Sequence, residues 1–353
     1  MKDLTLLSLP ISEQEYRKLP LISYSDLSSF VQKGFRSLTM EKFQNSGMSE
    51  GKILDILLTG DKNTIAENLA ILEFDLPSDN IVAIIQNTIQ ALKLTKQPIP
   101  KSLTGTLPIA VTNQFHIQAK VLGYGQSLKP ETLIKKIVDE GNIYFSFYLE
   151  NKDKQIVDFS TFEKISDLIP ELQLNPYTND YIVCENEDIE FYDQLKFSLP
   201  DGEFKIKGMM DRIIVDHKNK TIQICDFKLT NEDEEEFEIR ILKFNYDIQA
   251  MVYNYIIKEI IKEDSYYQDF IVLPFKFIVI DPDTNSPIVW QFPDLDVDER
   301  IITSYGYPRK SWKSLYKELE FYKSLPEPPR YSRRTMENNG CNEISILKNV
   351  YPF

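Results

Sequence analysis

Three short motifs in the second half of the chain carry residue types that could act on a phosphodiester. They are, in order, Gly208-Met-Met-Asp211, Asp226-Phe-Lys228 and Gln249-x-x-x-Tyr253. Two adjacent carboxylates repel each other unless a cation lies between them, and Mg²⁺ prefers oxygen ligands. A lysine beside such an ion can hold a water next to a phosphate and stabilise the charge that develops there. These residue types predict metal-assisted hydrolysis, provided that the fold brings them together.

A hairpin is expected to bring the first two motifs together. The polar run 216–221 separates two stretches with strand-like alternation, and paired residues in a hairpin share a constant index sum. Depending on where the turn is centred, Asp211 pairs with Asp226 or with Lys228. In either register the three side chains share one face, with opposed Cβ atoms about 4.5–5.5 Å apart. The backbone carbonyl of Phe227 could be a further oxygen ligand. The alternative is a cross-strand Asp–Lys pair on a solvated hairpin.

The third motif lies on a predicted helix over 247–263. A spacing of four residues places Gln249 and Tyr253 on one face of that helix. Their polar groups could then aim at a DNA phosphate or at the attacking water. The alternative is that Tyr253 is a core aromatic with a polar tip.

The scarcity of other reactive residues narrows the chemistry. The chain has two histidines, His116 and His217, and three cysteines, Cys184, Cys225 and Cys341, none close to another in sequence. This inventory argues against a zinc site with several histidines, a four-cysteine iron–sulfur cluster and a Ser–His–Asp set. We expect three reduced, mostly buried thiols.

The composition indicates a folded, acidic protein rather than a general binder of polyanions. Of 353 residues, 40 are Lys or Arg and 54 are Asp or Glu, which gives a net charge of −14. Such a surface repels nucleic acid except where basic residues cluster. No apolar run reaches the roughly 18 residues that span a bilayer, and the N-terminus lacks the features of a signal peptide. We therefore expect a cytoplasmic protein with no membrane partner.

Apolar periodicity divides the chain into a helical first half and a second half with several strands, which predicts an α+β fold. The first twenty residues are expected to be extended. Helices are expected at about 25–34 with Ser25 as N-cap, 50–58, from 79, from 130, from 160 or 161, and at 247–263; strands are expected at 191–198, 203–215, 221–228 and 270–280. The corresponding domains are 1–60, 61–185, 186–293 and 294–353.

A basic and aromatic tail is the best candidate to contact DNA. Residues 309–334 include eight basic and three acidic side chains, and Trp312, Tyr316, Tyr322 and Tyr331 are interleaved with them. These types suit phosphate contacts and base stacking; the alternative is a terminal helix whose aromatics pack inward.

The candidate DNA-binding residues are three lysines near the proposed site and five basic residues of the tail. They are Lys205, Lys207, Lys243, Arg309, Lys310, Lys313, Arg333 and Arg334.

Taken together, the motifs resemble the RecB-like branch of the PD-(D/E)XK nuclease superfamily, and within it the phage exonuclease VIII (RecE) type. Two N-terminal segments are also similar, 24–30 (YSDLSSF) to the family's opening helix and 51–58 (GKILDILL) to its Gly-x-x-x-His helix. The resemblance covers roughly 20–60 and 185–280. It implies a restriction-endonuclease-like core, a mixed sheet flanked by helices, with a helical N-terminal insertion.

The chain departs from the family pattern at one metal ligand, because Asp55 stands where the family usually has His. Asp is a hard ligand, so the metal set implied by the resemblance is Asp55, Asp211, Asp226 and the Phe227 carbonyl, holding Mg²⁺ or Mn²⁺. The resemblance implies an exonuclease on linear duplex DNA, working in recombination with a single-strand annealing protein and in some relatives as ring-like homo-oligomers. Its location would be the bacterial cytoplasm, or the host's for a phage protein. The alternative is a catalytically silent nuclease fold that binds DNA or acts as a scaffold.

Overall fold

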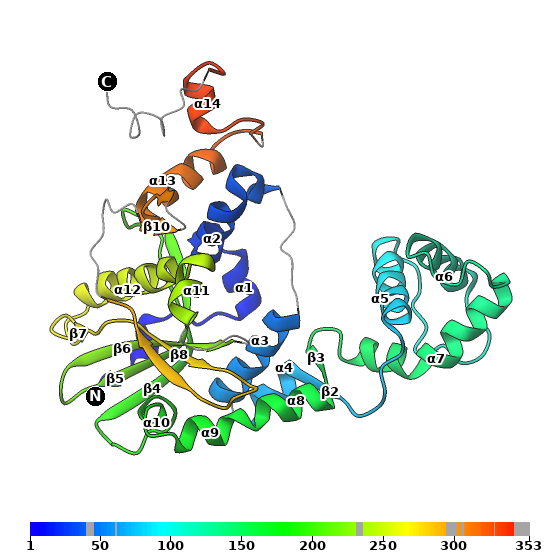
Figure 1. Ribbon diagram of the computed structural model, residues 1–353, viewed down its shortest axis with the longest axis horizontal. Coiled ribbons are helices and arrows are strands. Elements are labelled where there is room, and N and C mark those ends of the chain that lie inside the picture. Colours follow the sequence, from blue (N-terminus) through cyan, green and yellow to red (C-terminus); the bar gives the residue numbers. More distant parts are fainter. Residues whose placement is uncertain are drawn as a thin grey trace. The chain divides into compact units, whose positions relative to one another are not determined.

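The protein is described by a computed structural model that divides into two compact units (Figure 1). One unit comprises Met1–Gly51 and Leu168–Phe353, and the other comprises Lys52–Asp167. The structure describes residues 1–39, 46–60, 62–230, 236–293, 302–304, 307–327 and 329–341, without the side chains of 46–49, 62–64, 302–304 and 307–309.

The first unit is built on a mixed seven-stranded sheet. β4 and β6 run antiparallel to β5, whereas β1 is parallel to β5, and β7 and β8 are parallel to β6; β9 then closes the sheet antiparallel to β8. The α+β fold class is confirmed. The strands are β1 (Ile22–Ser23), β4 (Ile189–Leu199), β5 (Ile206–Asp216), β6 (Thr221–Leu229), β7 (Ile271–Val272), β8 (Lys276–Ile280) and β9 (Ile288–Gln291).

The single strand predicted over 270–280 is two strands, β7 and β8. Pro274 lies between them, and proline cannot donate to a central ladder. β8 pairs with β6 on one side and with β9 on the other. This central position is the one that its apolar residues on both faces predict.

Helices cover both faces of this sheet (Figure 1). One face packs against a large apolar core to which α2, α11, α12 and α13 all contribute. On the other face α10 contacts the sheet through Tyr181, whose carbonyl accepts a hydrogen bond from Arg212 of β5. The bounds are α2 (Tyr24–Lys33), α9 (Leu168–Leu174), α10 (Asn179–Ile182), α11 (Phe237–Lys243), α12 (Tyr246–Lys262), α13 (Trp312–Lys323) and α14 (Arg333–Glu337), and the small hairpin β10 (Ile302–Ser304) and β11 (Tyr307–Arg309) precedes α13.

Two predictions for the N-terminal segment are wrong. The first twenty residues are not extended, because they form a 3₁₀ turn, Leu4–Leu7, and a short helix, α1 (Glu13–Lys18), that starts with a capping box. The N-cap of α2 is Ser23 rather than Ser25, since the Ser23 hydroxyl accepts from the N–H of Asp26 while the Asp26 carboxylate accepts from the N–H of Ser23. The remainder of this segment is η2 (Gly34–Leu38).

The second unit is mainly helical and has a core of its own. Its three long helices α5, α6 and α7 bury a set of Ile, Leu and Phe side chains between them. A two-stranded parallel ribbon, β2 with β3, accompanies them. Its elements are the end of α3 (Ser46–Thr59), α4 (Lys62–Asn68), β2 (Leu69–Leu72), α5 (Asp79–Leu94), α6 (Ile109–Val121), α7 (Pro130–Glu150), β3 (Gln155–Asp158) and α8 (Phe159–Ser166). Among the described residues, no helix is both long and apolar enough to cross a membrane.

Candidate active site

The hairpin of β5 and β6 adopts the first of the two expected registers. Arg212 pairs with Cys225 and Asp216 pairs with Thr221, so the index sum is 437. The ladder between the two strands ends at Arg212 and Cys225, and Asp211 and Asp226 are the residues that follow this last pair on β5 and β6. Both carboxylates therefore belong to the end of the hairpin that is remote from its turn.

The sheet opens beside Asp211. β4 occupies one whole edge of β5, and β1 and β6 share the other. Pairing with β1 covers Ile206 and Lys207, pairing with β6 begins at Arg212, and residues 208–211 lie between the two. On the β4 side the ladder passes over Gln194, whose φ is +53°, a value that non-glycine residues rarely adopt. Asp211 thus lies where β5 parts from β6, and its backbone is not paired with either β1 or β6.

Asp226 is the most buried member of the candidate site, with 1% of its surface exposed. Its Oδ2 forms an ion pair with the Lys228 ammonium, and its Oδ1 accepts a hydrogen bond from Nε2 of Gln249. The Oε1 atom of Gln249 is buried and has no hydrogen-bond partner among the described residues. The amide therefore orients the carboxylate and keeps an acceptor for a further ligand.

Lys228 remains a cation in this environment. Burial disfavours the charged ammonium, but the nearby Asp226 carboxylate, followed by Tyr246 and Asp211, more than offsets that penalty, so the pKa of Lys228 is raised well above its usual range. The ring of Tyr246 lies beneath the ammonium, 4.9 Å from its centroid. At neutral pH Lys228 therefore donates hydrogen bonds and balances negative charge rather than accepting a proton.

Two tyrosines from different elements complete the cluster, Tyr253 buried and Tyr24 partly buried. The rings of Tyr24, on α2, and Tyr253, on α12, meet edge to face with centroids 6.2 Å apart. Burial, reinforced by the charges of Asp211 and Asp226, raises the pKa of both hydroxyls. Each hydroxyl keeps its proton at neutral pH, so each is a hydrogen-bond donor toward an anion.

Gly208 sets the distance between β5 and α12. A Cβ at this position would lie 3.0 Å from Cδ1 of Ile256 and 3.2 Å from Cδ1 of Tyr253. Such contacts are tighter than normal packing, so the strand and the helix approach this closely only because residue 208 has no side chain. The first motif thus needs its glycine to bring Tyr253 beside Asp211.

Sequence reasoning missed three members of this neighbourhood. Tyr24 and Tyr246 both act electrostatically on Lys228, and Arg240 of α11 acts in turn on Tyr246. Tyr246 had a detectable signal, since it precedes Gln249 by three residues and so lies on the same helix face. Tyr24 belongs to the YSDLSSF segment but carried no signal of its own role.

The cluster fits a hard divalent cation in its chemistry. It offers the carboxylates of Asp211 and Asp226, the free acceptor of Gln249 and the main chain at Phe227, and these are all oxygen ligands of the kind Mg²⁺ selects. No group of three His, Cys, Asp or Glu side chains within the described residues is arranged to hold a metal. Asp55 lies on α3 in the second unit, and its role as a metal ligand stays a prediction.

The candidate DNA contacts near the site separate into buried and exposed residues. Lys207 is 5% exposed, and its ammonium donates to the carbonyls of Tyr16, Arg17 and Leu19 at 2.9–3.2 Å. It caps the C-terminus of α1, and we remove it from the set of DNA contacts. Lys205 and Lys243 are exposed on the surface.

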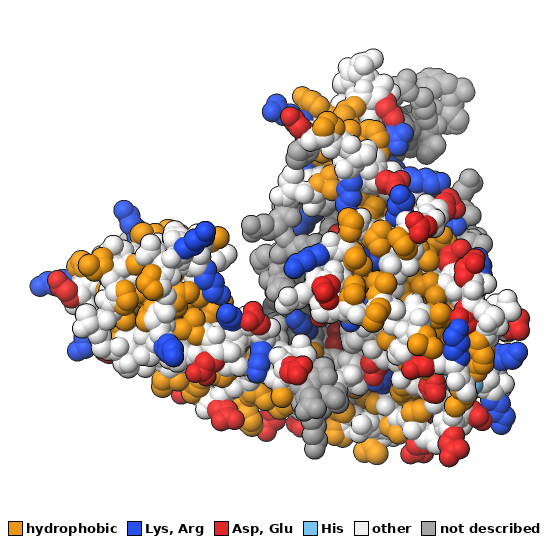
Figure 2. All heavy atoms as spheres, turned by 180° about the vertical axis from the view of Figure 1, so that it is seen from behind, with side chains coloured by type: hydrophobic (Ala, Val, Ile, Leu, Met, Phe, Trp, Pro, Cys, Tyr) orange, Lys and Arg blue, Asp and Glu red, His pale blue; other side chains and the backbone are white. Residues whose placement is uncertain are grey.

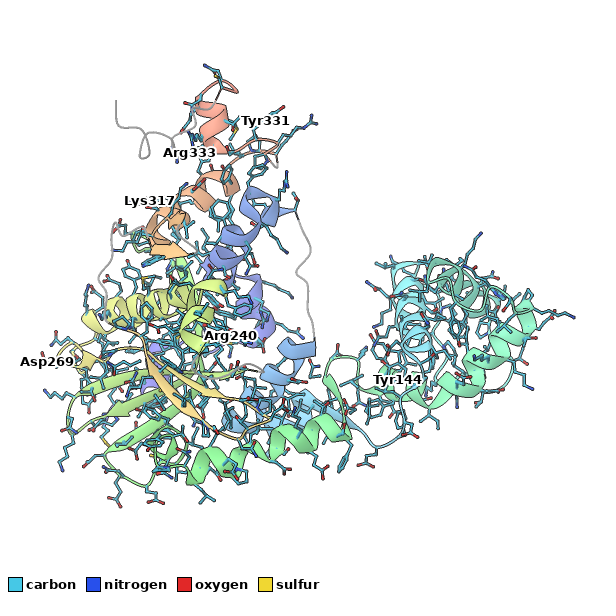
Figure 3. All side chains as sticks on the ribbon, viewed as in Figure 1. Tyr144, Arg240, Asp269, Lys317, Tyr331 and Arg333 are labelled. Carbon is cyan, nitrogen blue, oxygen red and sulfur yellow. The ribbon has the colours of Figure 1, made fainter. Side chains whose placement is uncertain are left out.

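The basic tail is also only partly available. Trp312, Tyr316 and Tyr322 are buried against the sheet core, so the expectation that these aromatics stack on bases is wrong, whereas Tyr331 is 63% exposed (Figure 3). The three rings recur at helical spacing on α13, so they share the face of the helix that packs on the core. Three of the tail candidates have partners within the protein: Lys310 pairs with Glu318, Lys313 lies 6.0 Å from the centroid of the Trp312 ring, and Arg333 pairs with Glu337 at 2.7 Å. Arg334 is exposed on α14. Arg309 ends β11, and its side chain is outside the described residues.

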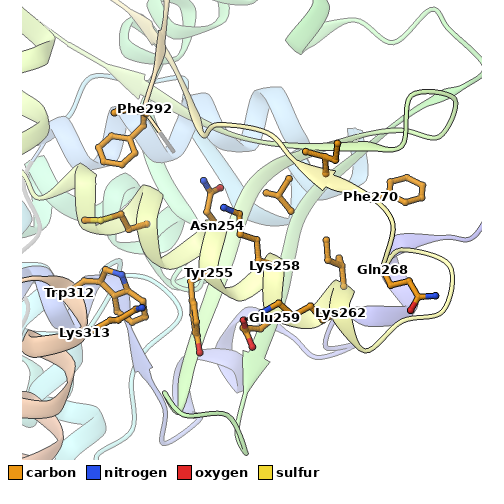
Figure 4. A pocket seen from close by; sticks show the side chains of 15 residues that line it. Asn254, Tyr255, Lys258, Glu259, Lys262, Gln268, Phe270, Phe292, Trp312 and Lys313 are labelled. Carbon is orange, nitrogen blue, oxygen red and sulfur yellow. Dashed lines mark hydrogen bonds and ion pairs between the residues drawn. The ribbon is translucent and has the colours of Figure 1, made fainter. Parts of the chain in front are cut away.

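A cleft of about 660 Å³ lies beside α12 (Figure 4). By the helical period, the residues of α12 that line it lie on the opposite side of the helix from Gln249 and Tyr253. Asn254, Lys258 and Trp312 are among the side chains that line it. None of the five candidate catalytic residues does so. The proposed chemistry therefore belongs to the open edge of the sheet rather than to this cleft.

Comparison with known families agrees with the geometry. Residues 161–320 match the family model described as the PD-(D/E)XK nuclease superfamily. This segment, just under half of the chain, contains Asp211, Asp226 and Lys228 together with Gln249 and Tyr253. The chain therefore contains a PD-(D/E)XK nuclease superfamily domain, and its mixed sheet flanked by helices is consistent with a restriction-endonuclease-like fold. A search of curated proteins finds no match.

Proposed function

We propose that the protein is a metal-dependent DNA nuclease of the RecB-like, exonuclease VIII type, acting on the ends of linear duplex DNA in phage or bacterial recombination. The nuclease class rests on the superfamily domain. The observation that carries the proposal is the state of Asp226, a buried carboxylate held between a cationic Lys228 and Gln249. Burying a charge in this way is costly, and buried ionisable groups of this kind cluster at functional sites, where they bind ions or substrate.

Each residue has a role that its contacts support. Asp211, Asp226 and the Phe227 carbonyl, with Asp55 as a further candidate, would hold Mg²⁺ or Mn²⁺, and the bound ion would lower the pKa of the attacking water and offset phosphate charge. Lys228 donates to that water or to a phosphate oxygen. Gln249 fixes the orientation of Asp226 through its amide N–H.

Tyr253 and Tyr24 supply neutral hydroxyl donors toward the substrate, because burial raises the pKa of both. The exposed cations Lys205 and Lys243 are proposed to contact the DNA backbone on the way into the site. On the same resemblance we propose that the protein works with a single-strand annealing protein and forms a homo-oligomer.

The decisive experiment compares cleavage of matched linear and circular duplex DNA with Mg²⁺, with Mn²⁺ and with chelator. We expect wild type to degrade linear DNA only, and Asp226→Asn and Lys228→Ala to lose at least about a thousandfold in rate. Asp269→Asn is the matched control, because this exposed carboxylate near β7 pairs with Lys220 and not with a candidate catalytic residue within the described part of the chain, so the rate should be unchanged (Figure 3).

Three results would contradict parts of the proposal. Cleavage of circles would show an endonuclease. Cleavage that survives Asp226→Asn would place the chemistry elsewhere. DNA binding without cleavage in either metal would favour the catalytically silent scaffold, and Asp55→His would then be the variant to test for recovered activity.

A further inference from the structure

The second unit carries a stretch of chain from which acidic residues are missing. Residues 80–130 include five lysines and no Asp or Glu, although 54 acidic residues in 353 would place about eight in a stretch of this length. The chain as a whole has a net charge of −14. This stretch therefore carries a local charge of +5 on an otherwise acidic protein.

The five lysines are available for an external partner. All are exposed, and none forms an ion pair within the described residues. They lie at the end of α5, in the loop that follows, at the end of α6 and just before α7, and they are Lys93, Lys96, Lys101, Lys120 and Lys129.

Helix α6, in the middle of this stretch, has two apolar faces. Val111, Phe115 and Ala119 lie one turn apart, and they are almost completely buried against α5 and α7. Ile117 and Val121 lie on the opposite side and are 50% and 73% exposed. A helix that packs on one side needs only one apolar face, so the second face is not explained by the core of this unit.

Two further aliphatic residues of this stretch are exposed. Ile109, two turns before Ile117, is 78% exposed, and Leu94 at the end of α5 is 77% exposed. Figure 2 shows hydrophobic side chains gathered on this unit with Lys and Arg around them. An apolar centre with a charged rim is the usual composition of a surface that binds another protein.

We propose that this surface, made of Ile109, Ile117, Val121, Leu94 and the five lysines, binds an acidic amphipathic segment of a partner protein. Aliphatic side chains in the centre suit the apolar stripe of such a segment, and the lysines suit its flanking carboxylates. Nucleic acid fits less well, because bases stack on aromatic rings rather than on Ile and Val. Two copies of the same face would repel each other through their lysines. The proposal does not depend on the nuclease assignment.

The test uses the full-length chain and a fluorescein-labelled synthetic helix, in which Leu recurs every three or four residues and Glu fills the flanking positions. Fluorescence anisotropy measures its binding, and a scrambled peptide of the same composition measures charge alone. We expect the ordered peptide to bind at least tenfold tighter than the scrambled one. Ile117→Asp with Val121→Asp, and separately Lys120→Glu, should weaken binding by tenfold or more.

Two control variants carry the same types of change elsewhere. Leu174→Asp alters an 82% exposed aliphatic residue of α9, and Lys152→Glu alters an exposed lysine outside the acid-free stretch. Both should bind the ordered peptide like wild type. Circular dichroism checks that the variants keep their helices, which the exposure of the changed residues predicts.

Several outcomes would overturn the proposal. Equal binding of the two peptides would reduce the surface to a general attraction for anions. Binding of a labelled single-stranded or duplex oligonucleotide that is lost in the Ile117 and Val121 variant, without peptide binding, would make the surface a nucleic-acid site. Self-association in sedimentation experiments that the same variant abolishes would make the occupant a second copy. Absence of binding by every probe would also reject it.

Discussion

The buried pair of Asp226 and Lys228 has a cost in stability. Taking both charges out of water is costly, and their mutual attraction repays this only in part. The pKa of Lys228 is raised because Asp226, followed by Tyr246 and Asp211, outweighs the effect of burial. The ammonium is thus the counter-charge that makes a buried carboxylate tolerable in the absence of any other cation.

A double-mutant cycle tests this view. Lys228→Met removes the counter-charge and should lower the free energy of unfolding at neutral pH by about 3 kcal/mol. Asp226→Asn combined with Lys228→Met removes both charges of this pair and should recover most of that loss, although we expect neither variant to cleave DNA. Urea denaturation with chelator present measures both effects. A double variant no more stable than Lys228→Met would show that the two charges are not coupled.

Register arithmetic predicted the index sum of the hairpin between β5 and β6, because a hairpin is a local structure with a fixed period of two. The contributions of Tyr24 and Tyr246 were not predicted, since proximity to Lys228 depends on how α2 and α12 pack on the sheet. Lys207 shows the opposite limit. Its sequence context resembles that of a surface cation, yet α1 packs over its ammonium, which donates to the carbonyls of Tyr16 and Leu19.

The contact of β5 with α12 shows how packing between two elements governs the site. Gly208 lets the helix approach until Tyr253 lies beside the carboxylates, and the neighbouring atoms belong to Ile256, Met210 and Tyr253. The position of Tyr253 relative to β5 therefore depends on the absence of one methyl group at residue 208.

Gly208→Ala should consequently lower both stability and activity. We expect a loss of about 1–2 kcal/mol in the free energy of unfolding from overpacking, and a lower rate constant because α12 must shift. Ile256→Val deletes the Cδ1 atom nearest to the added methyl and should restore part of both in the double variant. Thermal denaturation and single-turnover cleavage measure the two properties. Unchanged activity in Gly208→Ala would show that Tyr253 needs no such placement.

The strands and most long helices were predictable, and α6 explains where prediction stops. β4, β5, β6 and α12 lie within three residues of their expected bounds, because each has one clear apolar period. α6 was not predicted at all. Its Ile109, Ile117 and Val121 are apolar on the side away from the core, so the contrast between faces on which helix prediction depends is weak.

The separation of the chain into two units has a direct test. Unit Lys52–Asp167 is continuous in sequence and has its own apolar core. A fragment spanning 46–167, which keeps α3 whole, should be helical by circular dichroism and unfold cooperatively with heat. Phe115→Ala in that fragment should cost about 3–5 kcal/mol, because this ring is fully buried. A fragment without a cooperative transition would show that the unit depends on the rest of the chain.

The interrupted unit also constrains how the protein is made. Its N-terminal part ends at Gly51 and its sheet strands β4 to β9 follow Leu168, so α2 leaves the ribosome well before α12, the helix its Tyr24 contacts. At about 5–20 residues per second, translating the intervening segment takes on the order of 10 s. During that time Leu27 and Phe30 have no core to enter, whereas α5, α6 and α7 can already assemble. We expect the newly made N-terminal segment to be a substrate for chaperones until the sheet is complete.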